Sequence, residues 1–341
     1  MKKILIFGAG SIGNHMSYAS TKLGHKVFIT DKDPFALKRM KNTIYPKRYG
    51  RWDKKIIQIN FDDLRNLKEK FDLIIVGIPP KFHLEILDFC KKNIFFKKIL
   101  IEKPLCVYYQ NFKRKDLKDK KIFSGYNHSI SQSFLYFLGK LKIANFNKMV
   151  SLEANWKEGW YGILNAHFWM NNEFDSYLGN VREGGGALHE HSHGLHLLII
   201  LLKQMKISLN SLNFKRNIFF KNQKTKKYDY FGAFVASYKG KIIKYETDLI
   251  TFPSKKEIRV NYHDKSIIWK CNFKKGIDLV RVISNQKVND KVFKKTRSSE
   301  FENEIRHILS ANKKYNGLSN LDMKYSIATM KCIKSLLENE K

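Results

Sequence analysis

Cysteine is scarce in this sequence. The 341 residues include four cysteines, Cys90, Cys106, Cys271 and Cys332, and no two of them form a C-x-x-C pair. Such wide spacing argues against both a zinc knuckle and a disulfide framework. It fits a reducing compartment, so we expect a cytoplasmic protein.

Long apolar runs are also missing. The first run after the N-terminal lysines breaks at Gly8, which argues against an export signal. The longest later run, Leu195 to Leu202, contains His196 and is less than half of the ~20 residues that span a bilayer. The sequence therefore predicts a soluble protein with no membrane partner.

Acidic residues are few beside basic ones. The chain has 64 Lys and Arg against 31 Asp and Glu, a formal net charge of +33. Such an excess often indicates nucleic acid, an anionic membrane or an acidic ligand as partner. Here 53 of the 64 cations are Lys, which lacks the planar fork that Arg offers to bases and phosphates. We infer a lysine-rich background, predict no nucleic-acid partner, and note that lysines in a binding site would favour an anionic substrate.

The length predicts about two domains. The first third alternates short apolar runs with charged amphipathic stretches, which is typical of a parallel sheet covered on both faces. The runs are at 4–7, 27–29, 56–59, 73–78, 99–101 and 122–123. We predict an α/β fold whose residues 1–126 form a Rossmann domain with a doubly wound parallel sheet.

The pattern changes after residue 126. β-rich segments at 214–220, 231–238, 241–247 and 258–262 predict a largely antiparallel sheet. Ser319, with Asp322 three residues later, predicts the start of a closing C-terminal helix. Residues 127–341 are therefore expected to form an α+β domain that binds substrate and carries catalytic groups.

Gly8-Ala9-Gly10-Ser11-Ile12-Gly13 fits G-x-G-x-x-G between a strand and a helix. The first glycine allows a tight turn, the second lets backbone approach a pyrophosphate, and the third lets helix and strand pack closely. Asp31, 18 residues after Gly13, is placed to bind the adenosine ribose hydroxyls. We predict a dinucleotide site that prefers NAD, because a carboxylate repels a 2′-phosphate. NADP stays open, since Lys32 and Lys38 are near enough in sequence to hold that phosphate.

Open α/β sheets bind ligands beyond the carboxyl ends of their strands. Ile78, Pro79 and then His83 follow the fourth run, and Glu102-Lys103-Pro104 follows the fifth. We expect Ile78, Pro79, His83, Glu102 and Lys103 to contact the cofactor. Taken alone, Glu102 and Lys103 are also compatible with an ordinary solvated pair, and Pro104 with a proline that stops a strand.

Together, the glycine turn, the proline and histidine after the fourth run and Glu102-Lys103-Pro104 after the fifth resemble the Gfo/Idh/MocA family of oxidoreductases. The resemblance covers essentially the whole chain. It implies that Lys103 lies beside the nicotinamide and the substrate hydroxyl with a catalytic role, and that the peptide to Pro104 is often cis. It also implies a homo-oligomer that pairs through exposed sheet faces.

A histidine-rich segment, His189-Glu190-His191-Ser192-His193, follows three glycines. It contains H-E-x-x-H, the helical pattern of zinc hydrolases. A third ligand is not evident, and zinc leaves the upstream dinucleotide fold unexplained, so we predict no metal and keep the hydrolase as an alternative. The family resemblance instead implies that Glu190 and His193 are catalytic. His196 is expected to be a core residue.

We therefore predict an NAD(P)-dependent oxidoreductase that moves a hydride between nicotinamide and a secondary hydroxyl of a sugar-like substrate. A histidine, with an ordinary pKa of about 6.5, suits His193 to take the hydroxyl proton. Lys103 would stabilise the charge on the oxygen and Glu190 would orient the pair. Which of Lys103 and His193 is the formal base stays open.

Substrate contacts are expected from four polar or aromatic side chains: Asn127, Asn155, Trp169 and His189. A non-catalytic dinucleotide sensor remains the second alternative.

Overall fold

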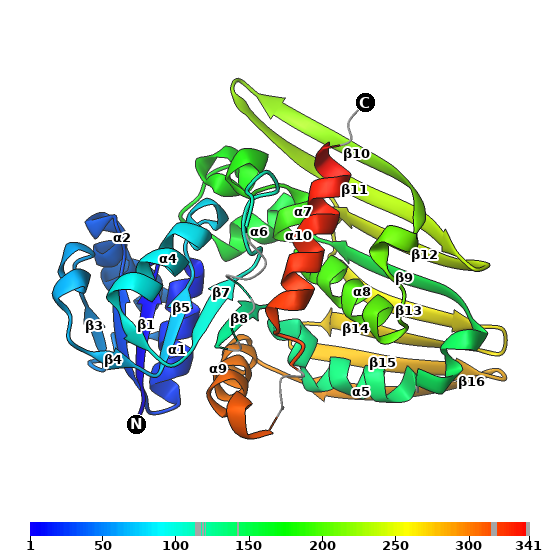
Figure 1. Ribbon diagram of the computed structural model, residues 1–341, viewed down its shortest axis with the longest axis horizontal. Coiled ribbons are helices and arrows are strands. Elements are labelled where there is room, and N and C mark those ends of the chain that lie inside the picture. Colours follow the sequence, from blue (N-terminus) through cyan, green and yellow to red (C-terminus); the bar gives the residue numbers. More distant parts are fainter. Residues whose placement is uncertain (113–116, 118, 120, 142, 315–318, 339–341) are drawn as a thin grey trace. The chain divides into compact units, whose positions relative to one another are not determined.

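The computed structural model describes residues 1–341 except 113–116, 118, 120, 142, 315–318 and 339–341 (Figure 1). The chain divides into two compact units. The first comprises Met1–Cys106, Asn111–Asn127 and Arg297–Lys324, and the second comprises Val107–Gln110, His128–Thr296 and Tyr325–Lys341. The sequence boundary at 126 assigns every later residue to one domain, whereas the structure returns Arg297–Lys324 to the first unit.

The first unit contains a six-stranded sheet in the order β3-β2-β1-β5-β7-β8, with all neighbours parallel. Its strands are β1 Lys3–Phe7, β2 Lys26–Thr30, β3 Ile56–Gln58, β5 Leu73–Val76, β7 Ile99–Glu102 and β8 Ile122–Gly125. Every residue of β5 and β7 is buried, as expected where both faces of a sheet are covered. The six predicted runs are all strands, and the doubly wound fold is confirmed.

Helices connect these strands: α1 Ser11–Lys22, α2 Pro34–Arg39, α3 Tyr45–Tyr49 and α4 His83–Asn93. A further helix of this unit, α9 Arg297–Lys314, comes from the returning segment. α9 packs on α1, where the rings of Phe301 and His15 stack 5.1 Å apart. A two-stranded sheet of β4 Lys70–Phe71 and β6 Phe95–Phe96 was not predicted, because two residues are too few to show a strand period.

The second unit is built on an eight-stranded sheet in the order β10-β11-β12-β9-β13-β14-β15-β16. Its strands are β9 Met149–Lys157, β10 Asn213–Gln223, β11 Lys226–Tyr238, β12 Lys241–Asp248, β13 Lys255–Tyr262, β14 Lys265–Lys274, β15 Ile277–Ser284 and β16 Lys287–Lys294. The β12–β9 pair is parallel and the other neighbours are antiparallel. The predicted, largely antiparallel sheet is confirmed.

Helices cover one face of this sheet. They are α5 Gln132–Leu141, α8 Ser192–Gln204 and α10 Met323–Glu338, with shorter α6 Trp160–Ala166 and α7 Ala187–Glu190 beside them. α10 holds β10 through Arg216, whose guanidinium donates to the carbonyl oxygens of Ser335 and Leu336. The predicted closing helix exists but begins at Met323, because the Ser319 hydroxyl accepts the N–H of Leu321 in the preceding turn.

Within the described ranges, no helix combines the length and the apolar character needed to cross a bilayer.

A buried ion pair stabilises the second unit. The carboxylate of Asp278 on β15 is buried and accepts from the Ser133 hydroxyl at 2.6 Å and the Asn272 N–H at 2.8 Å. The Lys295 ammonium lies 2.9 Å from the same carboxylate, and its side chain is 11% exposed. Removing the cation would leave a buried charge without its partner.

Lys295→Met should therefore lower the free energy of unfolding by about 3–5 kcal/mol, the usual loss when one partner of a buried pair is removed. Urea unfolding followed by circular dichroism measures this loss. The neighbouring Lys294→Met is a matched control, because Lys294 is exposed and should change stability by less than about 0.5 kcal/mol. Equal stabilities of the two variants would contradict the assignment.

Candidate functional site

The glycine turn joins three segments of the first unit through backbone contacts. The Gly8 N–H donates to the carbonyl of Thr30 at 2.8 Å, and the Gly77 N–H donates to that of Phe7 at 2.9 Å. Gly8 has φ +101°, and a Cβ there would lie 2.5 Å from the Gly77 carbonyl oxygen. A Cβ on Gly13 would overlap the carbonyl oxygen of Gly8. Both positions therefore require glycine for packing alone.

Gly10 differs from its neighbours in the motif. It precedes α1 as the N-cap residue and, being glycine, has no side chain to cap the helix. A Cβ built on Gly10 would have no heavy atom of another segment within 4 Å. The first N–H groups of a helix lack intrahelical partners and carry partial positive charge. The open space at Gly10 thus lets an anionic group approach the helix end.

Two charged side chains flank this helix end. The Asp31 carboxylate accepts from the Ala9 N–H at 2.7 Å and the Asp33 N–H at 2.9 Å, which ties the end of β2 to the turn. A carboxylate has about four acceptor positions, so capacity for a ribose hydroxyl remains. The Arg48 guanidinium donates to the Ser11 hydroxyl at 3.1 Å and to its carbonyl at 3.3 Å.

Arg48 was missed from the sequence, because 37 residues separate it from Ser11 and α3 delivers it through packing. Burial lowers its pKa below the usual value, yet guanidinium stays charged at any physiological pH. Lys32, the sequence candidate for a phosphate, instead pairs with Glu85 at 3.2 Å. Arg48 is thus the cation that the structure places at the turn.

His83 proves to be an internal support. Its side chain is completely buried, with Nε2 2.8 Å from the Ile78 carbonyl and Nδ1 3.0 Å from that of Pro104. Burial lowers its pKa to about 4, against the opposing effect of the carbonyls, so the ring is neutral. The single N–H of the neutral ring donates to one of these carbonyls, and the ring packs between the loops after β5 and β7. Its complete burial leaves no exposed surface for the predicted cofactor contact.

Glu102 and Lys103 point to different environments at the end of β7. Glu102 is 5% exposed, and a Cβ on Gly125 of β8 would lie 2.7 Å from its carboxyl group. Lys103 is partly exposed, and its N–H donates weakly to the Glu102 carboxylate at 3.4 Å. The Lys103–Pro104 peptide is cis, as the resemblance implied. Glu102 therefore faces the interior.

The strand order brings the predicted cofactor residues of this unit together. β2, β1, β5 and β7 are neighbours and parallel, so their carboxyl ends share one edge. Asp31, Gly8, Ile78 and Lys103 follow these strands in that order along the edge. Asn127, two residues beyond β8, is mostly buried.

In the second unit, the glycine run is packed against backbone. A Cβ on Gly185 would overlap the carbonyl oxygens of Tyr177 and Leu178, and one on Gly186, at φ +88°, would overlap the Asp229 carboxylate. Asp229 on β11 accepts the Leu188 N–H at 2.7 Å and so caps α7. This capping carboxylate was missed, because it lies 41 residues from its partner.

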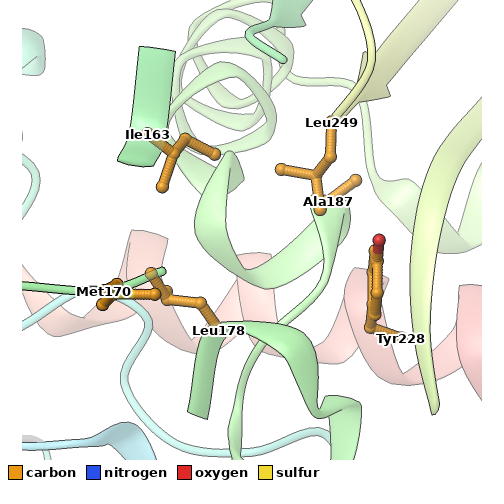
Figure 2. Close-up of a cluster of buried hydrophobic side chains, with 6 residues drawn as sticks. All are labelled: Ile163, Met170, Leu178, Ala187, Tyr228 and Leu249. Atoms are coloured by element: carbon orange, nitrogen blue, oxygen red, sulfur yellow. The ribbon is translucent and has the colours of Figure 1, made fainter. Parts of the chain in front are cut away.

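A small hydrophobic core lies around the start of α7 (Figure 2). Its buried members are Ile163, Met170, Leu178, Ala187, Tyr228 and Leu249. Trp169, predicted to contact substrate, packs against this core and is partly buried. Its first role is therefore to complete the packing that holds α7.

The H-E-x-x-H pattern does not lie on one helix. α7 ends at Glu190, and α8 begins after His191, whose φ of −95° and ψ of 19° interrupt the helix. His189 Nδ1 is 3.0 Å from the Gly185 carbonyl, whereas the His193 ring lies 4.7 Å from that of His128. In the part of the chain that the structure describes, no group of three His, Cys, Asp or Glu could hold a metal ion. The two imidazoles are not one helical turn apart, so the geometry does not favour a zinc hydrolase.

The other histidines of the segment are buried, unlike His193. His189 and His191 are buried, and burial lowers the pKa of His191, whose Nε2 is 3.2 Å from the Glu158 carbonyl. His196 is also buried, 3.3 Å from the Thr329 hydroxyl, which confirms its expected core role. Glu190 and His193 are both partly exposed and so can meet a ligand.

The His193 ring sits in a polar and aromatic cluster. It lies 5.7 Å from Trp156 of β9 and edge-on to His128. His128 Nδ1 is 3.7 Å from the Cys271 sulfur, which accepts from the Lys295 ammonium at 3.4 Å. A chain of contacts thus connects His193 through His128 and Cys271 with the Asp278–Lys295 pair.

Asn155, a predicted substrate contact, lies on the face of the sheet opposite to His193. Successive residues of a strand point to opposite faces, and Trp156 is the residue that contacts His193. Asn155 therefore points away from His193, as do Glu153 and Lys157 on the same strand. The sequence analysis named Asn155 without predicting β9, so the face on which its side chain lies was not available.

The comparisons with known proteins agree with this architecture. No family model matches the chain. Glycerol-3-phosphate dehydrogenase [NAD(P)+] of Acholeplasma laidlawii is 35% identical over 81 residues, which make up 24% of this chain and 23% of that protein.

Solved structures match over nearly the whole length. KijD10, a 3-ketoreductase from Actinomadura kijaniata in complex with NADP and TDP-benzene, has a TM-score of 0.71 at 12% identity, over 98% of this chain and 96% of that one. Levoglucosan dehydrogenase, in complex with NADH and L-sorbose, has 0.70 at 11% identity, over 98% and 96%. The UDP-N-acetylglucosamine 3-dehydrogenase GnnA from Acidithiobacillus ferrooxidans has 0.68 at 10% identity, over 98% and 96%.

At this level of identity the likeness is one of fold. The chain thus has the two-unit fold of nicotinamide-dependent dehydrogenases and reductases, in agreement with the predicted fold and with the resemblance to Gfo/Idh/MocA oxidoreductases.

The glycine contacts predict opposite outcomes for two alanine substitutions in one motif. Gly13→Ala should lower the free energy of unfolding by about 1–3 kcal/mol or more, because its methyl group overlaps the Gly8 carbonyl. Gly10→Ala should cost at most about 1 kcal/mol, the loss of a favourable N-cap, because the space beside it is open. Urea unfolding of both variants checks this order, and a larger loss for Gly10→Ala would contradict it.

Proposed function

We propose that this protein is an NAD(P)-dependent oxidoreductase that acts on a secondary hydroxyl, or the corresponding ketone, of a sugar-like substrate. The observation that carries the proposal is the open space at Gly10 beside Asp31, on the sheet edge that also presents Lys103. The structural neighbours support it, since they include complexes with NADP and with NADH, one of which also holds L-sorbose.

The residues at the turn fit a dinucleotide. The N–H groups at Gly10 and Ser11 would receive the pyrophosphate, helped by the positive charge of Arg48. Asp31 would bind the adenosine ribose, and Ile78 and Pro79 would line the path toward the nicotinamide. We propose a preference for NAD, because Asp31 is fixed by two backbone donors in the position where a 2′-phosphate would meet its charge.

When bound, the nicotinamide supplies the site that accepts or donates a hydride. Lys103 would hydrogen-bond the reacting oxygen and stabilise negative charge on it. His193 would take the hydroxyl proton during oxidation and return it during reduction. Glu190, at the end of α7, would orient Lys103 and His193.

The substrate is proposed to be an anionic sugar derivative. The formal charge of +33 gives the protein a positive field that attracts anions more strongly than neutral polyols. A sugar acid or a nucleotide-linked sugar has the required charge and a secondary hydroxyl. His189 and Asn127, two of the predicted substrate contacts, are both largely buried.

NADH formation measured across neutral sugars, sugar acids and nucleotide-linked sugars, with NAD and NADP in parallel, tests the function. Lys103→Ala and His193→Ala should each lower kcat by about 10²–10⁴-fold, the usual contribution of such proton and charge stabilisation. The Kd for NADH, measured by fluorescence, should change no more than a few-fold in either variant.

Two exposed residues provide matched controls, Lys92→Ala and His263→Ala, which should keep wild-type turnover. Wild-type turnover in Lys103→Ala or His193→Ala would refute the role of that residue. Binding of NADH without turnover of any substrate by the wild type would favour a dinucleotide sensor.

We also propose that two copies pair through the sheet face opposite α8. On this face Glu153 lies between Arg259 and Lys244 of the neighbouring strands, and Val235 and Ile242 are 50% and 42% exposed. A face with alternating charges and exposed apolar groups is complementary to itself about a two-fold axis. Light scattering should give twice the chain mass of 40.2 kDa, and a mass of one chain at micromolar concentration would contradict the pairing.

A further inference from the structure

α9 carries a carboxyl group into the interior of the first unit. Glu304 is completely buried, between Phe301, Ile305 and Ile308 on the apolar side of the helix. Neither of its carboxyl oxygens has a hydrogen-bond partner among the described residues. An ionised carboxylate without partners is very unfavourable there, because burial removes its hydration.

A second carboxyl group, that of Glu102, acts on Glu304. Burial is the main cause that raises the pKa of Glu304 well above its ordinary value, and the Glu102 charge is the next. On α9 itself, Arg297 opposes this effect and Glu300 adds to it. Burial and the charge of Glu102 thus both favour the neutral form of Glu304.

Glu102 is linked in turn to the candidate catalytic lysine. Its carboxyl group fills the space left by the missing side chain of Gly125, and it accepts the N–H of Lys103. If Glu304 ionised, repulsion would push the Glu102 carboxylate out of this space. The Lys103 backbone would lose its hydrogen bond and its fixed position.

We propose that Glu304, held as a neutral acid, is a positioning residue for Lys103, and that its ionisation at alkaline pH disables the site. The catalytic consequence rests on the proposed function, whereas the protonation and the position of Lys103 do not. Glu304 acts through Glu102 and needs no contact with substrate or cofactor.

Stability should report the protonation directly. A carboxyl group whose folded pKa is raised contributes stability that is complete below the unfolded pKa and is lost as pH rises through the folded pKa. Glu304→Gln does not titrate, so its melting temperature should exceed that of the wild type increasingly from pH 6 to pH 9. Glu304→Met, which is apolar and of similar length, should behave the same way if the glutamine variant folds poorly.

Asp88→Asn, on the exposed side of α4, is the control and should follow the wild type at every pH. A difference in melting temperature between wild type and both Glu304 variants that stays constant with pH would overturn the proposed protonation.

The position of Lys103 can be followed without any substrate. Reductive methylation of lysines, quantified by mass spectrometry with Lys92 as internal reference, should modify Lys103 equally in wild type and Glu304→Gln at pH 7. At pH 9, Lys103 of the wild type should differ from that of the variant by at least threefold. Equal labelling at both pH values would overturn the positioning role.

The pH profile of turnover completes the test. Relative to pH 7, kcat of the wild type at pH 9 should fall at least tenfold more than kcat of Glu304→Gln, with KM for NAD unchanged. An equal fall of kcat between pH 7 and pH 9 in wild type and Glu304→Gln would overturn the proposed effect of Glu304 on catalysis. If the wild type turns over no substrate, the proposed function fails, and labelling together with melting still decides the role of Glu304.

Discussion

The candidate site of the first unit depends on the close approach of three backbone segments at the carboxyl end of β1. Gly8 follows the strand, Gly13 lies in the first turn of α1, and Gly77 follows β5. Glycine is required at 8 and 13 because a side chain would collide with a carbonyl oxygen. This contact brings the start of α1 to the edge of the sheet, and the edge then receives Asp31 from one side and Lys103 from the other. Every function proposed for this unit requires that geometry.

In the second unit, glycines again allow a close approach of segments, here next to the carboxylate of Asp229. Gly185 and Gly186 let the chain pass against the Tyr177 and Leu178 carbonyls and against Asp229, which then caps α7. The result is a short helix, α7, that packs on a hydrophobic core and is separated from α8 by His191. That interruption presents Glu190 and His193 in separate helices, so a sequence that matches a zinc motif forms a different arrangement.

Periodicity predicted most of the fold. The continuous apolar runs identified all six parallel strands, because strands covered on both faces are apolar throughout. The glycine spacing and Asp31 identified the edge at which we propose that a dinucleotide binds. The sequence did not show which unit a distant segment joins. The return of α9 to the first unit depends on which hydrophobic core its apolar side packs against. The face on which Asn155 of β9 lies was equally unavailable from the sequence.

One residue that the sequence prediction missed did leave a signal. Glu304 occurs among Phe301, Ile305 and Ile308, at helical spacing, so a charged residue interrupts an otherwise apolar stripe. Such an interruption of the stripe indicates a buried titratable group. Arg48 and Asp229 gave no comparable signal, because their partners are far away in sequence and their own surroundings are ordinary.

Buried titratable groups are handled in two ways in this protein. Burial lowers the pKa of His83 to about 4 and is the main cause that raises the pKa of Glu304, so it favours the neutral form of both. Other groups are paired, as in Glu302 with Lys22, Asp278 with Lys295 and Glu158 with Lys256. Burial alone would raise the pKa of Glu158, but Lys256 outweighs burial and lowers it.

Neutral groups cost little as long as the pH does not change their state, whereas paired groups keep their charges over a wide range. The sensitivity of the first unit to alkaline pH should therefore depend on Glu304. Its pKa is also raised by the charge of Glu102, one residue from the lysine on which the proposed chemistry depends.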